Sequence, residues 1–189
     1  MNKTNIKQSL LRSFSALVII GALLVLPIAD AGRPFPTPQG TASGTVSGCE
    51  NLTDVSHVGN LEIDTFSFTA TFTGTFTGTL VGTEVDVIHT DGSETVRATG
   101  VFTGSVAGSP QGTAVFTSIG TGGFHGNSTL SLQNIVGQGT NGLAGLHANL
   151  QLSPPTIVCG LAAPCPPQDG CQFEFTTDYA GLFVFASPK

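Results

Sequence analysis

The stretch TFSFTATFTGTFTGTLV, residues 65–81, decides the fold class of this 189-residue chain. Threonine or serine stands at almost every odd position, and the even positions carry four phenylalanines: Phe66, Phe68, Phe72 and Phe76. Successive side chains of a β-strand point to opposite faces, so the alternation predicts a strand with one aromatic face and one hydroxyl face. A helix would spread the same rings around its circumference.

The aromatic face of this stretch is predicted to turn inward, because burying a phenylalanine is worth roughly 1.5–3 kcal/mol. The stretch is long for one strand, so we expect a bend or bulge at Gly74 or Gly78 that lets the sheet curl and close. Two interpretations of the rings stay open. Either they fill a small core, or they line one wall of a cavity that holds a small apolar ligand.

A β-hairpin is predicted next. Asp91-Gly92 is a strong two-residue turn, because both residue types tolerate positive φ. Such a turn places Asp86 opposite Arg97 as a cross-strand ion pair. The other face of the hairpin is then expected to face the core, and it carries Val85, Val87, Val96 and Ala98.

The same register places His89 opposite Glu94 at the tip of the hairpin. These two residues are either an acid–base pair or half of a metal site, or they are a solvated pair beside a turn. We prefer the solvated pair.

Short strands separated by glycine-rich turns are expected along the rest of the chain. They are predicted at residues 112–118, 128–136, 145–152, 171–179 and 181–186. This pattern predicts an all-β antiparallel fold, either a barrel or a sandwich.

Four glycine-containing segments carry a resemblance to a known family. They are FTGTFTGTLVG (72–82), VFTGSVAG (101–108), GTAVFTSIGT (112–121) and GQGTNGLAGL (137–146). In these segments the chain resembles a family of small bacterial proteins that are grouped with plant allene oxide cyclase. The resemblance implies an antiparallel β-barrel of about eight strands with a central cavity. None of the catalytic residues of allene oxide cyclase can be matched here, so its cyclisation activity is not implied.

The N-terminus has the features of a cleavable signal peptide, residues 1–31. Lys3, Lys7 and Arg12 precede an apolar run at 14–28, and Ala29-Asp30-Ala31 gives a small-x-small cleavage site. The alternative is an uncleaved membrane anchor, for which the run is a little short. We therefore predict a protein that is secreted, periplasmic or at the cell surface, with no transmembrane segment after cleavage.

Residues 32–48 are rich in Pro, Gly, Ser and Thr, and they predict a flexible lead-in to a barrel domain at 49–189. Only 10% of the chain is charged and it contains 13 phenylalanines, which argues against disorder. Its net charge of −6, with only Arg33, Arg97 and Lys189 basic after the signal, argues against a nucleic-acid partner.

The four cysteines of an exported chain predict disulfides. We expect Cys159–Cys171 across the mouth of a hairpin, where facing positions have suitable spacing, and Cys49–Cys165 as the second bridge. The chain has no CxxC pair, so neither a zinc site nor thiol redox catalysis is predicted.

Recognisable catalytic and cofactor motifs are missing from the sequence. The glycine-rich segment 120–126 is not followed by Gly-Lys-Ser/Thr, and no Gly-x-Ser-x-Gly is present. His57, His125 and His147 lack the spacing of metal ligands. The sequence therefore predicts no cofactor, no metal and no catalytic residue.

Three functions stay open. The first is a binding module that holds a small apolar molecule against Phe66, Phe68, Phe72 and Phe76 inside the barrel. The second is a structural or cell-surface protein with Thr-rich strands that pair edge to edge. The third is an enzyme like allene oxide cyclase, with Glu62, Asp64 or Glu174 as its polar group. An outer-membrane barrel is a weaker fourth, because aromatic belts are missing.

Overall fold

The computed structural model describes residues 39–123, 131–160, 165 and 170–186. The predicted signal peptide at 1–31, residues 32–38 of the predicted lead-in, and His125 lie outside the described residues. In the described part of the chain, no helix is long and apolar enough to cross a membrane.

Nine antiparallel strands form the regular structure of the described residues, which contain no helix. The strands are β1 (Gln39–Val58), β2 (Leu61–Gly74), β3 (Phe76–Ile88), β4 (Ser93–Val106), β5 (Gly112–Gly123), β6 (Ser131–Asn141), β7 (Leu146–Leu152), β8 (Thr156–Cys159) and β9 (Phe173–Phe185). Their order in the sheet is β1-β2-β3-β4-β5-β6-β7-β9-β8. The predicted all-β antiparallel fold is confirmed.

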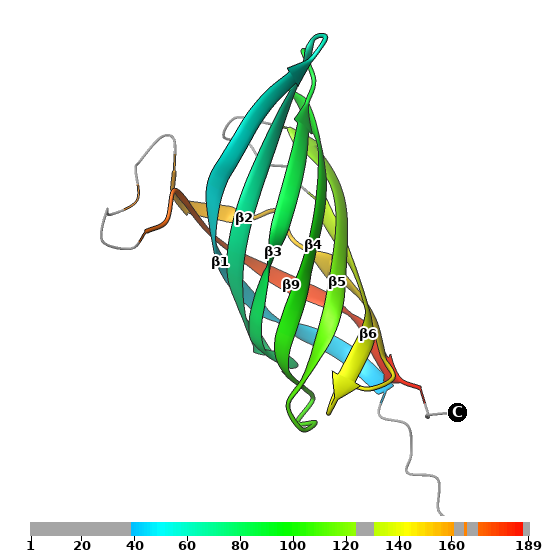
Figure 1. The fold of residues 1–189 in the computed structure, drawn as a ribbon. Coiled ribbons are helices and arrows are strands. Elements are labelled where there is room, and N and C mark those ends of the chain that lie inside the picture. The colour runs from blue at the N-terminus through cyan, green and yellow to red at the C-terminus, as the bar shows by residue number, and fades with distance from the viewer. Residues whose placement is uncertain (1–38, 124–130, 161–164, 166–169, 187–189) are drawn as a thin grey trace, which may run out of the picture. The chain divides into compact units, whose positions relative to one another are not determined.

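β1 closes the sheet into a ring, because it pairs with β2 on one side and with β9 on the other (Figure 1). Its residues 44–58 pair with β2, and its residues 39–50 pair with β9. Since β7 also pairs with β9, the ring runs through β1 to β7 and β9, while β8 adds four residues beside β9.

The ring includes residues 39–48, which we predicted to be a flexible lead-in. β1 begins at Gln39, ten residues before the predicted start of the domain at Cys49. Ala42 and Val46 are buried and the hydroxyl residues between them are exposed, so the segment has the period of a strand. Its small residues carry little hydrophobic signal, which is why its composition is also typical of a linker.

The predicted strand at 65–81 is two strands joined by a tight turn rather than one bent strand. β2 ends at Gly74, β3 begins at Phe76, and Phe72 pairs with Gly78. Gly74 has φ of 103°, and a Cβ there would lie 2.5 Å from the carbonyl oxygen of Ser43. Only glycine fits both the conformation and the close approach of β1.

The hairpin of β3 and β4 has a four-residue turn instead of the predicted two-residue turn. His89 N–H donates to the Ser93 carbonyl at 2.9 Å, and Ile88 pairs with Glu94. The Asp91 carboxylate accepts hydrogen bonds from both the backbone N–H and the hydroxyl of Ser93, at 2.9 and 2.7 Å, which stabilises the longer turn.

This register differs from the predicted one by a single residue, so the predicted core face is confirmed on β4, where Val96 and Ala98 are buried, and is reversed on β3. Asp86 pairs with Val96 and is buried, whereas Val85 pairs with Arg97 and both are exposed. The predicted Asp86–Arg97 ion pair is therefore wrong, as is the prediction that Val85 faces the core. His89 and Glu94 are likewise not opposite each other.

The remaining strands agree with the sequence pattern in part. β5 and β7 contain the predicted strands at 112–118 and 145–152 in all but one residue, and β6 begins at Ser131. The predicted strands at 171–179 and 181–186 are a single strand, β9. It continues through Gly181 because both β1 and β7 pair with it there.

The disulfides join Cys49 to Cys171 and Cys159 to Cys165, so the predicted pairing of Cys159 with Cys171 and Cys49 with Cys165 is wrong. The register explains the difference. β8 places Cys159 opposite Glu174, three residues beyond Cys171. Cys171 instead lies beside β1, where Gln172 N–H donates to the Asn51 side-chain oxygen at 3.0 Å.

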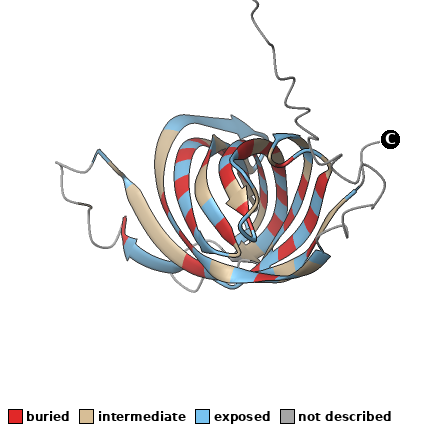
Figure 2. Cartoon of the chain, turned by 90° about the horizontal axis from the view of Figure 1, so that it is seen from below, coloured by how far each residue is buried: buried red, intermediate tan, exposed pale blue. Residues whose placement is uncertain are grey.

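Buried and exposed residues alternate along the strands, as the red and pale blue bands in Figure 2 show. The interior of the ring holds one hydrophobic cluster, formed mainly by the inward residues of every strand except β8. The interior is not uniform, because it has two ends of opposite chemistry.

Candidate binding site inside the closed sheet

Aromatic rings occupy one end of the interior. This aromatic end consists of Phe72, Phe76, Phe102, Phe116 and Tyr179. None of these residues is more than 2% exposed, and the ring centroids of neighbouring members lie 5.4–6.4 Å apart. Most of these contacts are edge-to-face or tilted, which is the preferred geometry of aromatic pairs.

The one hydroxyl group of the aromatic end is fully used. The Tyr179 hydroxyl accepts a hydrogen bond from the Phe76 backbone N–H at 2.8 Å and donates to the Thr73 carbonyl at 3.2 Å. It therefore satisfies the backbone of the turn between β2 and β3 from β9, which is separated from β2 by β1 alone.

The four phenylalanines of the predicted site divide into two sets. All four are buried, as the alternation predicts. Phe72 and Phe76 belong to the aromatic end, whereas Phe66 packs edge-to-face against Phe173 with centroids 5.7 Å apart, and Phe68 pairs with Glu50 and Gly82. Their role as ligand-lining residues stays a prediction.

Carboxyl groups gather at the other end of the interior. This acidic end consists of Glu50 on β1, Asp64 on β2, Glu84 and Asp86 on β3, and Glu94 on β4. Asp64 and Asp86 are directly opposite each other in the register of β2 and β3, and Glu84 lies two residues before Asp86 on the same face.

Burial and mutual repulsion shift these carboxyl groups toward their neutral forms. Burial is the largest cause of the raised pKa of Asp86, and the charge of Glu94 and a hydrogen bond with Glu94 add to it. Together they raise the pKa of Asp86 from 3.8 to about 8. Burial, then the charge of Glu94, raises the pKa of Glu50 from 4.5 to about 7. Burial, then Glu50, holds the pKa of Glu84 well above its ordinary value. Burial, then Glu62, raises the pKa of Asp64, and His57 partly opposes this.

Three polar atoms in this part of the interior are buried without a hydrogen-bond partner among the described residues. They are Asp64 Oδ1, Asp86 Oδ1 and Asn134 Nδ2, on side chains that are 6%, 7% and 3% exposed. Leaving a buried polar group unpaired costs about 1–3 kcal/mol, and more for a charged group. Such groups in a native fold need an explanation.

Asn134 lies on the same row of the interior as the acidic end. The register connects Glu84 to Ala98, Ala98 to Ser118, and Ser118 to Asn134, across β3, β4, β5 and β6. All four residues are buried, and the Ser118 hydroxyl donates to Asn134 Oδ1. Asp86 similarly lies opposite Val96, which lies opposite Gly120. On the β4 and β5 side of Glu84 and Asp86 the inward residues are therefore small, whereas on the β2 side Glu84 lies opposite Phe66.

No basic side chain neutralises the acidic end within the described residues. Arg97 is the one Lys or Arg in this part of the chain, and it is exposed. His57 pairs with Glu62 at 3.4 Å, and both side chains are largely exposed. In the described ranges, no group of three or more His, Cys, Asp or Glu side chains has an arrangement that could hold a metal ion.

Of the three carboxyl groups predicted as the polar group of a cyclase, the structure places one in the interior. Asp64 belongs to the acidic end. Glu62 is 43% exposed beside His57, and Glu174 lies opposite Cys49 on the face of β9 that alternates with buried Thr177 and Tyr179. The structure does not bring the three together.

Sequence reasoning missed Glu50 and Glu84, and it placed Asp86 beside Arg97 and Glu94 beside His89 rather than in an acidic cluster. The pattern Glu84-Val85-Asp86-Val87 does alternate, so it predicts a strand with one acidic and one apolar face. The ordinary expectation is that the valines turn inward, and only the register of the hairpin shows the reverse.

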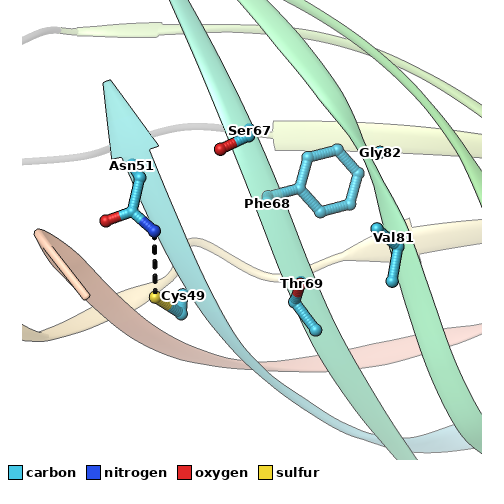
Figure 3. Close-up of a pocket in the computed structure, with 7 residues that line it drawn as sticks. All are labelled: Cys49, Asn51, Ser67, Phe68, Thr69, Val81 and Gly82. Carbon is cyan, nitrogen blue, oxygen red and sulfur yellow. Dashed lines mark hydrogen bonds between the residues drawn. The ribbon is translucent and has the colours of Figure 1, made fainter. Parts of the chain in front are cut away.

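A depression also lies on the outside of the sheet. Its lining includes Cys49, Asn51, Ser67, Thr69 and Val81, with the Phe68 ring and Gly82 at its floor (Figure 3). Ser67, Thr69 and Val81 are exposed, and the Asn51 side-chain amide donates to Cys49 Sγ at 3.8 Å. No ionisable side chain lines it, so the interior is the stronger candidate.

Comparison with known proteins supports the fold alone. No protein-family model and no curated protein matches this chain. The crystal structure of a protein of unknown function from the DUF3224 family of Shewanella oneidensis MR-1 is similar, with a TM-score of 0.51 and 17% sequence identity. The match covers 80% of this chain and all of that one. The resemblance to the allene oxide cyclase group is not confirmed, and the chain is similar in fold to a DUF3224 protein.

Proposed function

We propose that this chain is an exported β-barrel protein that binds one small, largely apolar molecule in the barrel interior, at the acidic end. The observation that carries the proposal is the pair of buried carboxyl oxygens, Asp64 Oδ1 and Asp86 Oδ1, which face the interior without a partner in the described part of the chain. Buried polar groups that converge in a protein interior are typical of ligand sites.

The size of the ring supports this function. Eight strands, β1 to β7 and β9, form the closed sheet. A barrel of about eight strands is just wide enough either to be filled by its own side chains or to hold one small ligand. The aromatic end corresponds to the filled case, and the small side chains of Ala98, Ser118 and Gly120 favour the second case at the acidic end.

The walls of the acidic end supply apolar contact as well. Phe66 and Phe173 pack edge-to-face there, and Phe68 lies opposite Glu50. An apolar body would lie against these rings, while the carboxyl groups would fix its orientation. Phe66 and Phe68 are therefore the members of the predicted aromatic set that we retain as ligand contacts.

Export is part of the proposal. The signal-like segment at 1–31 supports it, and two disulfides are compatible with an oxidising compartment. N-terminal sequencing of the protein recovered from the medium or periplasm tests it, and Gly32 is the expected first residue. Recovery of the intact Met1 form in the membrane fraction would contradict export.

The binding site is tested by filling it. Uptake of a neutral apolar dye such as Nile red should fall at least about tenfold in Ala98→Leu, because the added side chain occupies the acidic end. Thr99→Leu is the matched control, since Thr99 is the next residue of β4 and is exposed on the outer face. Equal dye uptake by wild type and a folded Ala98→Leu would place binding elsewhere, and no uptake by wild type would oppose the proposal.

A structural or cell-surface role is the second candidate. Val81 and Val101 favour it, because they pair on the outer face and are 55% and 50% exposed. Edge-to-edge assembly has little support, since the closed ring pairs both sides of its strands and β8 has only four residues. The third candidate, a cyclase, rests on Asp64 alone.

A further inference from the structure

We infer that the molecule held at the acidic end is an organic cation, an alkylammonium whose charged group lies between Asp64 and Asp86 and whose apolar body lies against Phe66. This inference rests on the proposed binding in the barrel interior, and it names the class of ligand. Four observations carry it.

The first observation is the unbalanced charge. Asp64 and Asp86 are cross-strand partners that share one face, and like charges directly opposite each other destabilise a sheet. In addition to burial, the charges of Glu94 and Glu50 raise the pKa of Asp86, and the charges of Glu50, Asp86 and Glu94 raise the pKa of Glu84. These carboxyl groups therefore interact as one acidic cluster. A cation among these groups offsets the repulsion, whereas an anion would add to it.

The second observation is the type of hydrogen bond that is missing. Asp64 Oδ1 and Asp86 Oδ1 are acceptors that lack donors in the described part of the chain, although their side chains are more than nine-tenths buried. An ammonium group has three N–H donors and no acceptor. It satisfies both oxygens at once, through charge-assisted hydrogen bonds that are stronger than neutral ones.

The third observation distinguishes an organic cation from a metal ion. Ca²⁺ needs six to eight oxygen ligands at 2.3–2.6 Å. The described residues contain no group of three acidic or other ligating side chains arranged for this. Carboxyl groups spread over β1, β2, β3 and β4 match a larger cation with several separate N–H donors better than a single small ion.

The fourth observation lies outside the carboxyl cluster. Asn134 Nδ2 is a buried donor without a described partner, on the row that connects Glu84 to Asn134 through Ala98 and Ser118. It provides a contact for a hydrogen-bond acceptor on the ligand, at the side of the barrel away from Asp64. The Phe66–Phe173 pair adds aromatic surface, which attracts both cations and apolar groups.

Three eight-carbon probes test the inference with the mature protein by titration calorimetry near neutral pH. They are octylamine as the cation, 1-octanol as its neutral counterpart and octanoate as the anion, and calcium chloride is titrated alone. We expect octylamine to bind at least about tenfold more tightly than octanol, and octanoate to bind more weakly than both. Asp64→Asn and Asp86→Asn should each remove most of this preference, without weakening octanol binding.

Glu174→Gln is the control, because it removes a carboxyl group from the outer face and should leave all three affinities unchanged. Thermal unfolding confirms that each Asn variant is folded, and we expect both to be at least as stable as the parent. Equal affinity for octylamine and octanol overturns the cation inference but leaves the proposed function standing. Binding of none of the three overturns both. Calcium binding that depends on Asp86 and excludes octylamine overturns the organic assignment.

Discussion

The two ends of the interior of the closed sheet have the same alternation of side chains and differ in the residues at the inward positions. At the aromatic end, rings contact rings, and the Tyr179 hydroxyl has both of its partners. At the acidic end, two carboxyl oxygens and one amide nitrogen are buried without a described partner. The ring contacts of the aromatic end stabilise the fold, whereas the unpaired polar atoms of the acidic end destabilise it.

The contrast between the two ends indicates where a functional site is expected. A sequence that specifies one structure tends to satisfy packing and polar groups everywhere, and departures concentrate at functional sites. Among the described residues, the buried groups with an unpaired atom are Asp64, Asp86 and Asn134, and all three lie away from the aromatic end. Substitutions at the two ends should therefore differ in their effects on stability.

Truncation at the aromatic end should have the largest effect on stability. Phe72→Ala removes a ring that contacts Phe76, Phe102, Phe116 and Tyr179, so we expect the free energy of unfolding to fall by roughly 3–5 kcal/mol. Urea denaturation measures it. Thr71→Ala, at an exposed neighbouring position, serves as the control. A loss below about 1 kcal/mol would mean that the aromatic end is not a packed core.

Removal of the disulfide that closes the longer loop should have the next largest effect on the free energy of unfolding. Cys49–Cys171 spans 122 residues and fastens β1 to the segment before β9, beside Glu50. Replacing both cysteines with serine should lower the free energy of unfolding by about 2–4 kcal/mol. The matched double substitution at Cys159 and Cys165, which span only 6 residues, should cost less.

Non-reducing peptide mapping checks the pairing directly. Peptides that join Cys49 to Cys171 and Cys159 to Cys165 are expected. A peptide that joins Cys159 to Cys171 would contradict the register of β8 against β9.

The acidic end should make stability depend on pH. Since the folded-state pKa values of Glu50 and Asp86 are raised to about 7 and about 8, the folded protein holds protons that the unfolded chain releases. The stability they contribute is complete below about pH 4 and is lost as the pH rises through about 7 and 8. The free energy of unfolding should therefore decrease from about pH 5 to about pH 8.

Asp86→Asn sharpens this prediction, because it removes the carboxyl group and keeps its shape. At pH 8.5 the variant should be more stable than the parent by on the order of 1 kcal/mol, and its stability should vary less with pH. Glu174→Gln should reproduce the parent profile. Denaturation series at several pH values measure both, and a parent whose stability rises over this range would refute the account of the acidic end.

The smallest effect is expected at Arg97, and it tests the register of the β3–β4 hairpin. Arg97→Ala should change the free energy of unfolding by less than about 0.5 kcal/mol, because Arg97 is exposed and Asp86 lies on the other face. A loss of several kcal/mol that Asp86→Ala abolishes would instead indicate an ion pair between them.

Local patterns in the sequence were enough for the all-β class and for the burial of Phe66, Phe68, Phe72 and Phe76, because alternation in a strand is a property of neighbouring residues. The acidic end could not be predicted in the same way. Glu84-Val85-Asp86-Val87 has two alternating faces, and a lone strand does not reveal which face is inside.

Residue type and spacing alone were enough to predict the all-β class, the aromatic face and the presence of cysteines for two disulfides. The closure of β1 on β9, the pairing of Cys49 with Cys171 and the inward direction of Asp86 could be learned only from the folded chain. Each of these depends on the register between segments, and the four-residue turn at 89–92 shows why. A shift of one residue leaves every local pattern intact but moves each side chain of the shifted strand, here β3, to the opposite face of the sheet.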